Sequence, residues 1–269
     1  MNVKDHKVFA KFAIPPSFGG NARNFTSTLY GIPGRLHKEK KIYGSPSAVY
    51  DTLVEEGVEH IYHANSVLTS CQFLRNKALM SRGSVEGMKL HQTAPSSDEI
   101  DKRMSVWFDV FADSVDIHDR VKNVNHYGPV LFVLDVEILR KSYTGRIWVT
   151  KLNPTKWAGM SHAERWFESR EDLKENFSEG TFDHMIVFRH CGGFLPFGSC
   201  LKRIIVDDPK MEVGKVDVFS GGCGALMLAM VDAGLDIPIV RRRCKPKCRC
   251  TATYEANEDR TTEMFLPMA

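Results

Sequence analysis

The sequence contains no apolar run that approaches the roughly 20 residues needed to span a bilayer. Its first residues, 1–7, are not followed by the apolar segment of a secretory signal. The 7 cysteines are an odd number, and four of them are scattered through the body of the chain, which argues against a disulfide framework. We therefore expect reduced thiols, a cytoplasmic location and no membrane partner.

Several common catalytic motifs are also missing. There is no GxxxxGKS/T loop, and no GxGxxG follows a strand pattern, which excludes the usual P-loop NTPases, kinases and Rossmann dehydrogenases. A GxSxG nucleophile elbow and an HExxH helix are absent too. The net charge of +3 is too small to predict nucleic-acid binding by itself.

The hydrophobic pattern predicts a mixed α+β fold. Runs rich in β-branched and aromatic residues predict strands, and apolar residues at three- and four-residue spacing predict helices. The predicted strands are 25–30, 60–63, 105–111, 128–135, 146–150 and a pair, 182–190 with 202–206; the predicted helices are 45–56, 67–78, 161–177 and 224–233, with a helical turn at 98–103 and a loop at 80–97. Because βαβ alternation is lacking, this order favours a largely antiparallel sheet bracketed by helices.

A histidine stands where the strand 60–63 ends and a helix begins. Asn65 or Ser66 can cap that helix, because either side chain accepts a hydrogen bond from a first-turn N–H. His63 can therefore project into a cleft beside a helix N-terminus, which suits a ligand that carries hydroxyls and phosphates. The alternative is a histidine that only makes a hydrogen bond at the end of a strand.

Short motifs follow one another in a recognisable order. They are Tyr62-His63-x-x-Ser66, Leu79–Arg82, Arg103, the strands 106–111 and 128–131, and an acidic loop, 175–183, that enters the strand 182–188. Over residues 55–210 this order resembles the ADP-ribosyltransferase fold, and most of all the DarT-like and CmdT-like toxins of bacterial anti-phage toxin–antitoxin systems, which modify nucleic acid. The resemblance implies a split antiparallel β-sheet core in a single domain, 1–240, with an N-terminal extension, 1–45, and a basic Cys-rich tail, 241–269.

The same resemblance implies that NAD donates ADP-ribose. Loss of nicotinamide leaves positive charge on the ribose C1′, which a nearby carboxylate can stabilise. By this resemblance Asp183 supplies the carboxylate, although the family usually has glutamate there, and Glu179 is the alternative. Either residue can instead be an ordinary loop carboxylate. Arg103 would contact NAD or the target, or else be a solvated charge at a helix end.

The cofactor-binding residues are also implied by the resemblance. His63 would bind the ribose hydroxyls, and Asn65 and Ser66 would lie against the cofactor where the helix starts. Trp107 and Phe108 would hold the nicotinamide by stacking. These two aromatic residues are neighbours in their predicted strand, so their side chains point to opposite faces. At least one of them should therefore pack in the core instead.

The segment 241–250 is the second unusual feature, with six basic residues and three thiols in ten positions. Its cations would contact phosphates without reading sequence. Cys244, Cys248 and Cys250 could ligate zinc with Cys223 or a histidine. Their C-x3-C-x-C spacing is not that of paired zinc knuckles, so we predict no metal and a flexible basic tail, or one that an acidic partner covers.

Three functions fit these observations. The first is an NAD-dependent ADP-ribosyltransferase that modifies RNA or DNA, acts as a toxin in anti-phage defence and is restrained by an inhibitory antitoxin protein. The second is a non-enzymatic module that binds RNA through the Cys/Arg-rich tail. The third is an NAD-dependent RNA 2′-phosphotransferase, which would need a phosphorylated RNA substrate.

Overall fold

The computed structural model describes residues 46–90, 92, 98–141 and 146–266. The predicted N-terminal extension, 1–45, and its predicted strand, 25–30, lie outside these residues. The helices are α1 (Pro46–Glu55), α2 (Val67–Asn76), α3 (Arg82–Gly87), α4 (Asp98–Arg103), α5 (Ile117–Val121), α6 (Ile138–Lys141), α7 (His162–Arg165), α8 (Arg170–Asn176), α9 (Val218–Ala233), α10 (Cys250–Glu255) and α11 (Glu258–Phe265), with a 3-10 turn, η1 (Pro154–Lys156). The strands are β1 (His60–Asn65), β2 (Ala78–Met80), β3 (Val110–Ala112), β4 (Val130–Asp135), β5 (Arg146–Val149), β6 (Ile186–Arg189), β7 (Phe194–Pro196), β8 (Leu201–Val206), β9 (Glu212–Val213), β10 (Val216–Asp217) and β11 (Ile239–Arg241).

The strands form several small sheets, most of them antiparallel. One sheet has the order β1-β4-β8-β11, in which only β11 runs parallel to its neighbour, and a second has the order β3-β6-β5. β2 pairs with β7, and β9 pairs with β10. The two larger sheets meet where Tyr62 and Asp113 exchange backbone hydrogen bonds of 2.9 and 2.8 Å. The predicted mixed α+β class is confirmed.

Strand β4 is the centre of the core, as the apolar run 128–135 predicts. Residues 130–134 are all buried, because the strand has β1 and β8 on either side and side chains packed on both faces. The Phe132 ring lies 5.9 Å from that of Phe73 and 5.7 Å from that of Phe197, measured between centroids. Burial of each such ring contributes about 1.5–3 kcal/mol, so this row of rings holds α2 against the sheet.

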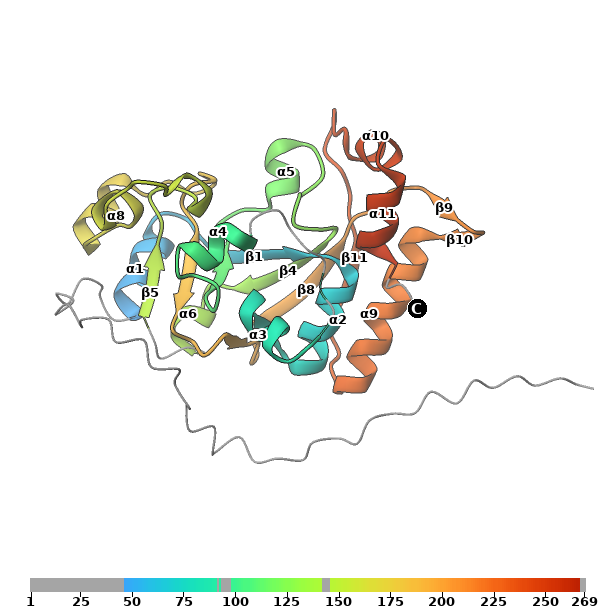
Figure 1. The fold of residues 1–269 in the computed structure, drawn as a ribbon, viewed down its shortest axis with the longest axis horizontal. Helices are drawn as coiled ribbons and strands as arrows, with labels where there is room; N and C mark the ends of the chain where they lie inside the picture. Colours follow the sequence, from blue (N-terminus) through green and yellow to red (C-terminus); the bar gives the residue numbers. More distant parts are fainter. Residues whose placement is uncertain (1–45, 91, 93–97, 142–145, 267–269) are drawn as a thin grey trace, which may run out of the picture. The chain divides into compact units, whose positions relative to one another are not determined.

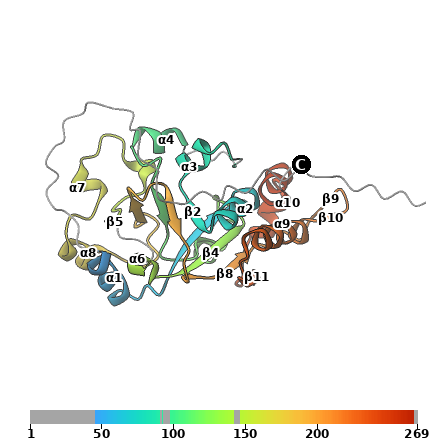
Figure 2. The same ribbon diagram turned by 90° about the horizontal axis from the view of Figure 1, so that it is seen from below.

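The helices form two groups around these sheets. Helices α2, α9 and α11 pack against one another beside β8, whereas α1, α6 and α8 pack together near β5 (Figure 1, Figure 2). Helix α9 ends at Gly234, whose φ of +61° favours glycine, as the sequence predicts. Within the described ranges, no helix has both the length and the apolar character that crossing a membrane requires.

Two predicted elements differ from the structure, one because of a local turn and the other because of a contact with a distant strand. The predicted strand 105–111 is a turn up to Asp109, whose N–H donates to the Val106 carbonyl, and only β3 is extended. The predicted helix 161–177 divides into α7 and α8, because Trp166 is extended and bridges to Thr150. The capping box of Ser161 and its glutamate is present at the start of α7.

Two further predictions need correction. The loop predicted at 80–97 contains α3, which starts from the capping side chain of Ser81. The strands predicted at 182–190 and 202–206 do not pair, because β6 joins the three-stranded sheet and β8 the four-stranded one.

The C-terminal segment is folded rather than flexible. Strand β11 pairs with β8, and α10 and α11 bury Cys250, Tyr254, Met264 and Phe265 against the rest of the described chain. In the segment 241–250, Arg242 is buried, while the other five basic residues are exposed. Apolar residues in α10 and α11, which the sequence analysis did not weigh, account for the difference.

Candidate active site

A pocket opens where the two larger sheets meet. Its empty volume is about 1090 Å³, which includes space that is open to solvent. Its walls come from the end of β1, the β2–α3 junction, α4, the segment around β3, the α5–β4 connection, the segment around η1, the start of β6 and α11. The lining residues are His63, Ala64, Asn65, Met80, Ser81, Arg82, Asp101, Asp109, Val110, Phe111, Asp113, His126, Tyr127, Asn153, Pro154, Thr155, Met185, Arg260, Glu263 and Met264.

His63 lies at the junction of the two sheets with its ring in a fixed orientation. Its Nδ1 is 2.7 Å from the Phe111 carbonyl oxygen, which can only accept, so Nδ1 carries the proton. The ring packs 5.5 Å from that of Phe73, between centroids. Burial lowers the pKa of His63 in spite of the hydrogen bond to Phe111. Nε2 is therefore an acceptor; it is buried and has no hydrogen-bond partner among the described residues.

Two aspartates of the pocket have perturbed pKa values. Burial raises the pKa of the Asp113 carboxyl from 3.8 to about 7. Burial also raises the pKa of Asp109, although Arg189 donates to its carboxylate at 3.0 Å and opposes that rise. The sequence analysis missed both residues. Each stands at one end of β3, and a carboxylate at a strand end next to an apolar run is the signal that was available.

The close approach of two strands at the pocket depends on a glycine. Gly128 has a φ of +150°, and a Cβ at this position would lie 2.1 Å from the backbone carbon of Asn65. Any side chain would therefore push the start of β4 away from the end of β1. Asn65 itself lines the pocket, and its Oδ1 accepts from the Ser66 N–H at 2.9 Å.

The predicted catalytic carboxylates do not line the pocket. Asp183 forms an ion pair with Lys156 at 2.7 Å and accepts from the Asn153 N–H at 3.1 Å. Burial alone would raise the pKa of Asp183, but these two contacts hold it below its usual value. Asn153 does line the pocket, so Asp183 lies one residue behind the wall. Glu179 is exposed near Gly57, at the turn after α1.

The other predicted residues divide between structural positions and the surface. Ser66 is buried as the N-cap of α2, and its Oγ accepts from the Thr69 N–H. Trp107 is buried and donates from Nε1 to Glu86 at 3.1 Å. Phe108 is 60% exposed, and Arg103 is exposed at the end of α4; neither lines the pocket. Of the eight predicted site residues, the pocket brings together His63 and Asn65.

Helix α11 supplies a wall that the sequence analysis did not anticipate. Arg260, Glu263 and Met264 recur at three- and four-residue spacing on one face of α11, and all three line the pocket. Arg260 and Arg82 give the lining positive charge, and Arg82 is paired with Asp98 at 2.8 Å. The pocket is therefore completed by a segment that stands about 200 residues after His63 in the chain.

Metal-ligating side chains gather elsewhere. His118 lies with Cys244, Cys248 and Cys250, whereas Cys223 belongs to α9 and is not in the group. This group does not share residues with the pocket.

The pocket can thus hold a ligand that offers a hydroxyl to a fixed imidazole acceptor, with carboxylates and arginines around it. No protein-family model matches this chain, and no curated protein matches it.

Proposed function

We propose that the protein is an NAD-dependent ADP-ribosyltransferase that modifies nucleic acid, and that the pocket around His63 binds NAD. The observation that carries the proposal is that His63 lines the pocket and that its buried Nε2 has no hydrogen-bond partner among the described residues. A neutral imidazole whose Nδ1–H is already donated can only accept at Nε2. A ribose hydroxyl is a donor of the required kind, and its binding would remove the cost of leaving a buried acceptor unpaired.

The charge distribution in the pocket also supports this chemistry. Departure of nicotinamide leaves positive charge on the ribose, and carboxylates aimed at that position stabilise it most where water is largely excluded. Asp113 and Asp109 line the same pocket as His63, at the two ends of β3. We therefore assign the charge-stabilising role to Asp113. Asp183 can act only indirectly, because it does not line the pocket and contacts it through Asn153.

The pyrophosphate of NAD needs cations or N–H groups. Arg260 on α11 lines the pocket, and guanidinium binds phosphate oxygens in a bidentate manner. The guanidinium of Arg82, which also lines the pocket, is held by Asp98. The N-terminus of α2, a ten-residue helix, begins next to Asn65, and its backbone dipole favours a negative group.

A nucleic-acid target is supported by the exposed cations of the segment 241–249. Five of its basic residues are exposed, and such side chains bind phosphates without sequence preference. The role as a toxin in anti-phage defence, and the inhibitory partner that it implies, follow from the resemblance in residues 55–210.

The test uses NAD labelled in its adenylate half, incubated with the full-length protein and RNA or DNA oligonucleotides. We expect label transfer and nicotinamide release by the wild type and a loss of both in His63→Ala. His60→Ala is the matched control, because His60 lies on the same strand but does not line the pocket. It should retain both activities.

Other results would overturn the proposal. Oligonucleotide binding without nicotinamide release, abolished by charge reversal in the segment 241–249, would indicate the RNA-binding module instead. Nicotinamide release only with RNA that carries a 2′-phosphate would indicate the phosphotransferase. Equal loss of activity in His63→Ala and His60→Ala, with both variants folded, would remove the pocket from the mechanism.

A further inference from the structure

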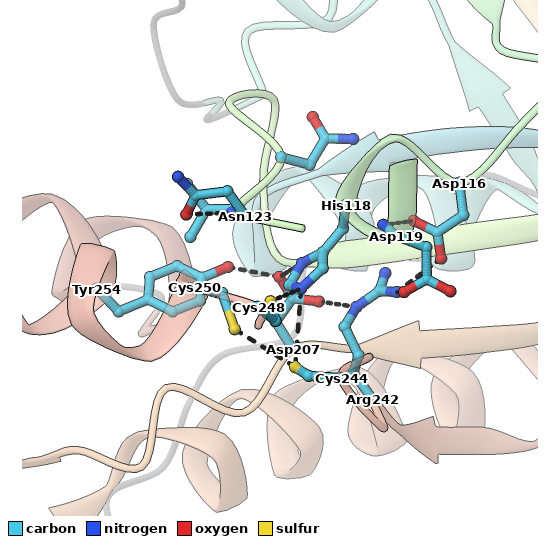
Figure 3. Close-up of polar contacts among 12 residues, drawn as sticks. Asp116, His118, Asp119, Asn123, Asp207, Arg242, Cys244, Cys248, Cys250 and Tyr254 are labelled. Carbon is cyan, nitrogen blue, oxygen red and sulfur yellow. Dashed lines mark hydrogen bonds and ion pairs between the residues drawn. The ribbon is translucent and has the colours of Figure 1, made fainter. Parts of the chain in front are cut away.

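Three thiols and one imidazole form a tight group at the start of the C-terminal segment. The group comprises His118 of α5 with Cys244, Cys248 and Cys250, whose Sγ and ring nitrogen atoms all lie within 4.8 Å of one another (Figure 3). Cys248 Sγ is 3.3 Å and Cys244 Sγ 3.8 Å from His118 Nε2. The Sγ atoms of Cys244 and Cys250 are 3.4 Å apart.

Three of the six separations are close to those of a tetrahedral zinc site, and the other three do not exceed 4.8 Å. Bond lengths of about 2.3 Å to sulfur and about 2.0–2.1 Å to nitrogen, at tetrahedral angles, put two sulfurs about 3.8 Å apart and a sulfur about 3.6 Å from a nitrogen. The observed separations of 3.3, 3.4 and 3.8 Å lie within a few tenths of an ångström of those values. An ion could therefore enter with small side-chain movements.

The histidine already has the tautomer that a metal needs. His118 Nδ1 lies 2.7 Å from the Asp207 carboxylate, which accepts a hydrogen bond from the Nδ1–H. The lone pair on Nε2 therefore faces the thiols. Both side chains are almost fully buried. A carboxylate that orients a histidine in this way is typical of zinc centres, where it fixes the ring and strengthens the ligand.

Asp207 is itself fixed by two other residues. Tyr254 Oη donates to its Oδ2 at 2.6 Å, and Arg242 Nε donates to its Oδ1. Arg242 also donates to Asp116 at 2.6 Å (Figure 3). The orientation of His118 is therefore set by a network that joins α5, the end of β8, β11 and α10.

We propose that His118, Cys244, Cys248 and Cys250 bind one zinc ion in a closed structural site. Three thiolates with one imidazole are a donor set that zinc prefers over the hard cations, and four protein ligands leave no position for a substrate. The site joins α5 to the C-terminal segment, where the Arg249 N–H also donates to the Lys122 carbonyl at 2.9 Å. It therefore anchors the segment that carries α10 and α11.

The first test measures metal in the full-length protein. Protein purified without added metal should contain one equivalent of zinc by elemental analysis, and modification of its thiols should release that zinc to a colorimetric indicator. After exchange with cobalt(II), thiolate-to-cobalt charge-transfer bands and tetrahedral d–d absorption should appear. Protein that is folded, free of metal and unable to take up zinc or cobalt would overturn the proposal, as would a Cys244–Cys250 disulfide found by mass spectrometry.

Variants assign the ligands. His118→Ala and Cys248→Ser should lose the stoichiometric zinc, whereas Cys223→Ser, which changes a thiol outside the group, should retain it. Asp207→Asn, which changes the orienting carboxylate and also the partner of Arg242 and Tyr254, should weaken zinc binding about 10–100-fold. Full zinc retention in both ligand variants would refute the assignment.

If a ligand variant does not fold, the structural role of the ion is tested on the wild-type protein. Chelation of the zinc should accelerate tryptic cleavage within residues 241–249, which contain six basic residues, and re-addition of zinc should reverse the effect. Cleavage that is unaffected by a chelator that has removed all the metal would show that the ion does not anchor this segment.

Discussion

Asp113 should make the stability of this protein depend on pH in a direction opposite to that of most carboxylates. Its pKa is near 3.8 when the chain is unfolded and about 7 in the folded protein, where burial disfavours the charge. Between these two values the folded state holds a proton that the unfolded chain has released. Stability therefore decreases as the pH rises through this range, and it is fully recovered below the unfolded pKa.

The magnitude follows from the difference in pKa. At about 1.4 kcal/mol for each factor of ten in proton affinity, the upper limit is about 4 kcal/mol over the whole range. Between about pH 5 and pH 8 we expect roughly 2 kcal/mol, because part of the titration lies below pH 5 and the pocket mouth admits solvent. Asp113→Asn removes the charge while keeping the shape, so its stability advantage over the wild type should grow by roughly 2 kcal/mol from pH 5 to pH 8.

Urea unfolding followed by tryptophan fluorescence at several pH values measures this difference. Asp183→Asn is the matched control: the pKa of Asp183 is lowered by Lys156 and the Asn153 N–H against the effect of burial. A lowered pKa contributes stability above the unfolded value that is lost only as the pH falls through the folded one. Its difference from the wild type should be constant from pH 5 to pH 8. A constant difference for Asp113→Asn as well would refute the reasoning.

Three further substitutions test the core, the pocket and the buried network. Phe132→Ala should lower the free energy of unfolding by about 3–5 kcal/mol in urea titrations, because it removes the ring that is fully buried in β4. Gly128→Ala should abolish soluble folded protein or strongly lower its Tm, whereas Gly87→Ala, which meets nothing within 4 Å, should leave the Tm within a few degrees of the wild type. Asp207→Asn should cost about 3 kcal/mol or more in the same titrations, because a buried arginine loses a charged partner; a cost below 1 kcal/mol would contradict the geometry of that network.

Elements with a strong local signal could be predicted from the sequence. The apolar run of β4, the cap at Ser66 and the glycine that ends α9 each depend on neighbouring residues, and each is found where it was predicted. The errors arise where distant residues decide the conformation. Trp166 leaves the helical pattern because its ring packs 4.8 Å from that of Trp157, between centroids, and its backbone bridges to Thr150.

The candidate site was only partly accessible to sequence reasoning. His63 could be found because the end of a strand and the start of a helix are both visible locally. Asp113 also stands at a strand end, but its raised pKa results from burial by other parts of the chain, which the sequence does not show. Asp183 lies in a loop, and its ion-pair partner, Lys156, comes from the connection between β5 and α7. The sequence does not show this contact, which fixes the position of the Asp183 carboxylate.

A metal at Cys244, Cys248 and Cys250 was not predicted because their C-x3-C-x-C spacing is not that of paired zinc knuckles, and the fourth ligand was left open between Cys223 and a histidine. His118 stands 126 residues before the first of these cysteines, and the pairing of β11 with β8, together with the Arg249 N–H bond to the Lys122 carbonyl, brings them together. The same pairing positions α11, whose Arg260 and neighbours complete the pocket. Because Tyr254 of α10 packs on Phe265 of α11 at 5.4 Å between ring centroids, loosening the thiol group should also loosen this wall. Removal of zinc should therefore weaken ligand binding in the pocket, although the ion and the ligand share no residue.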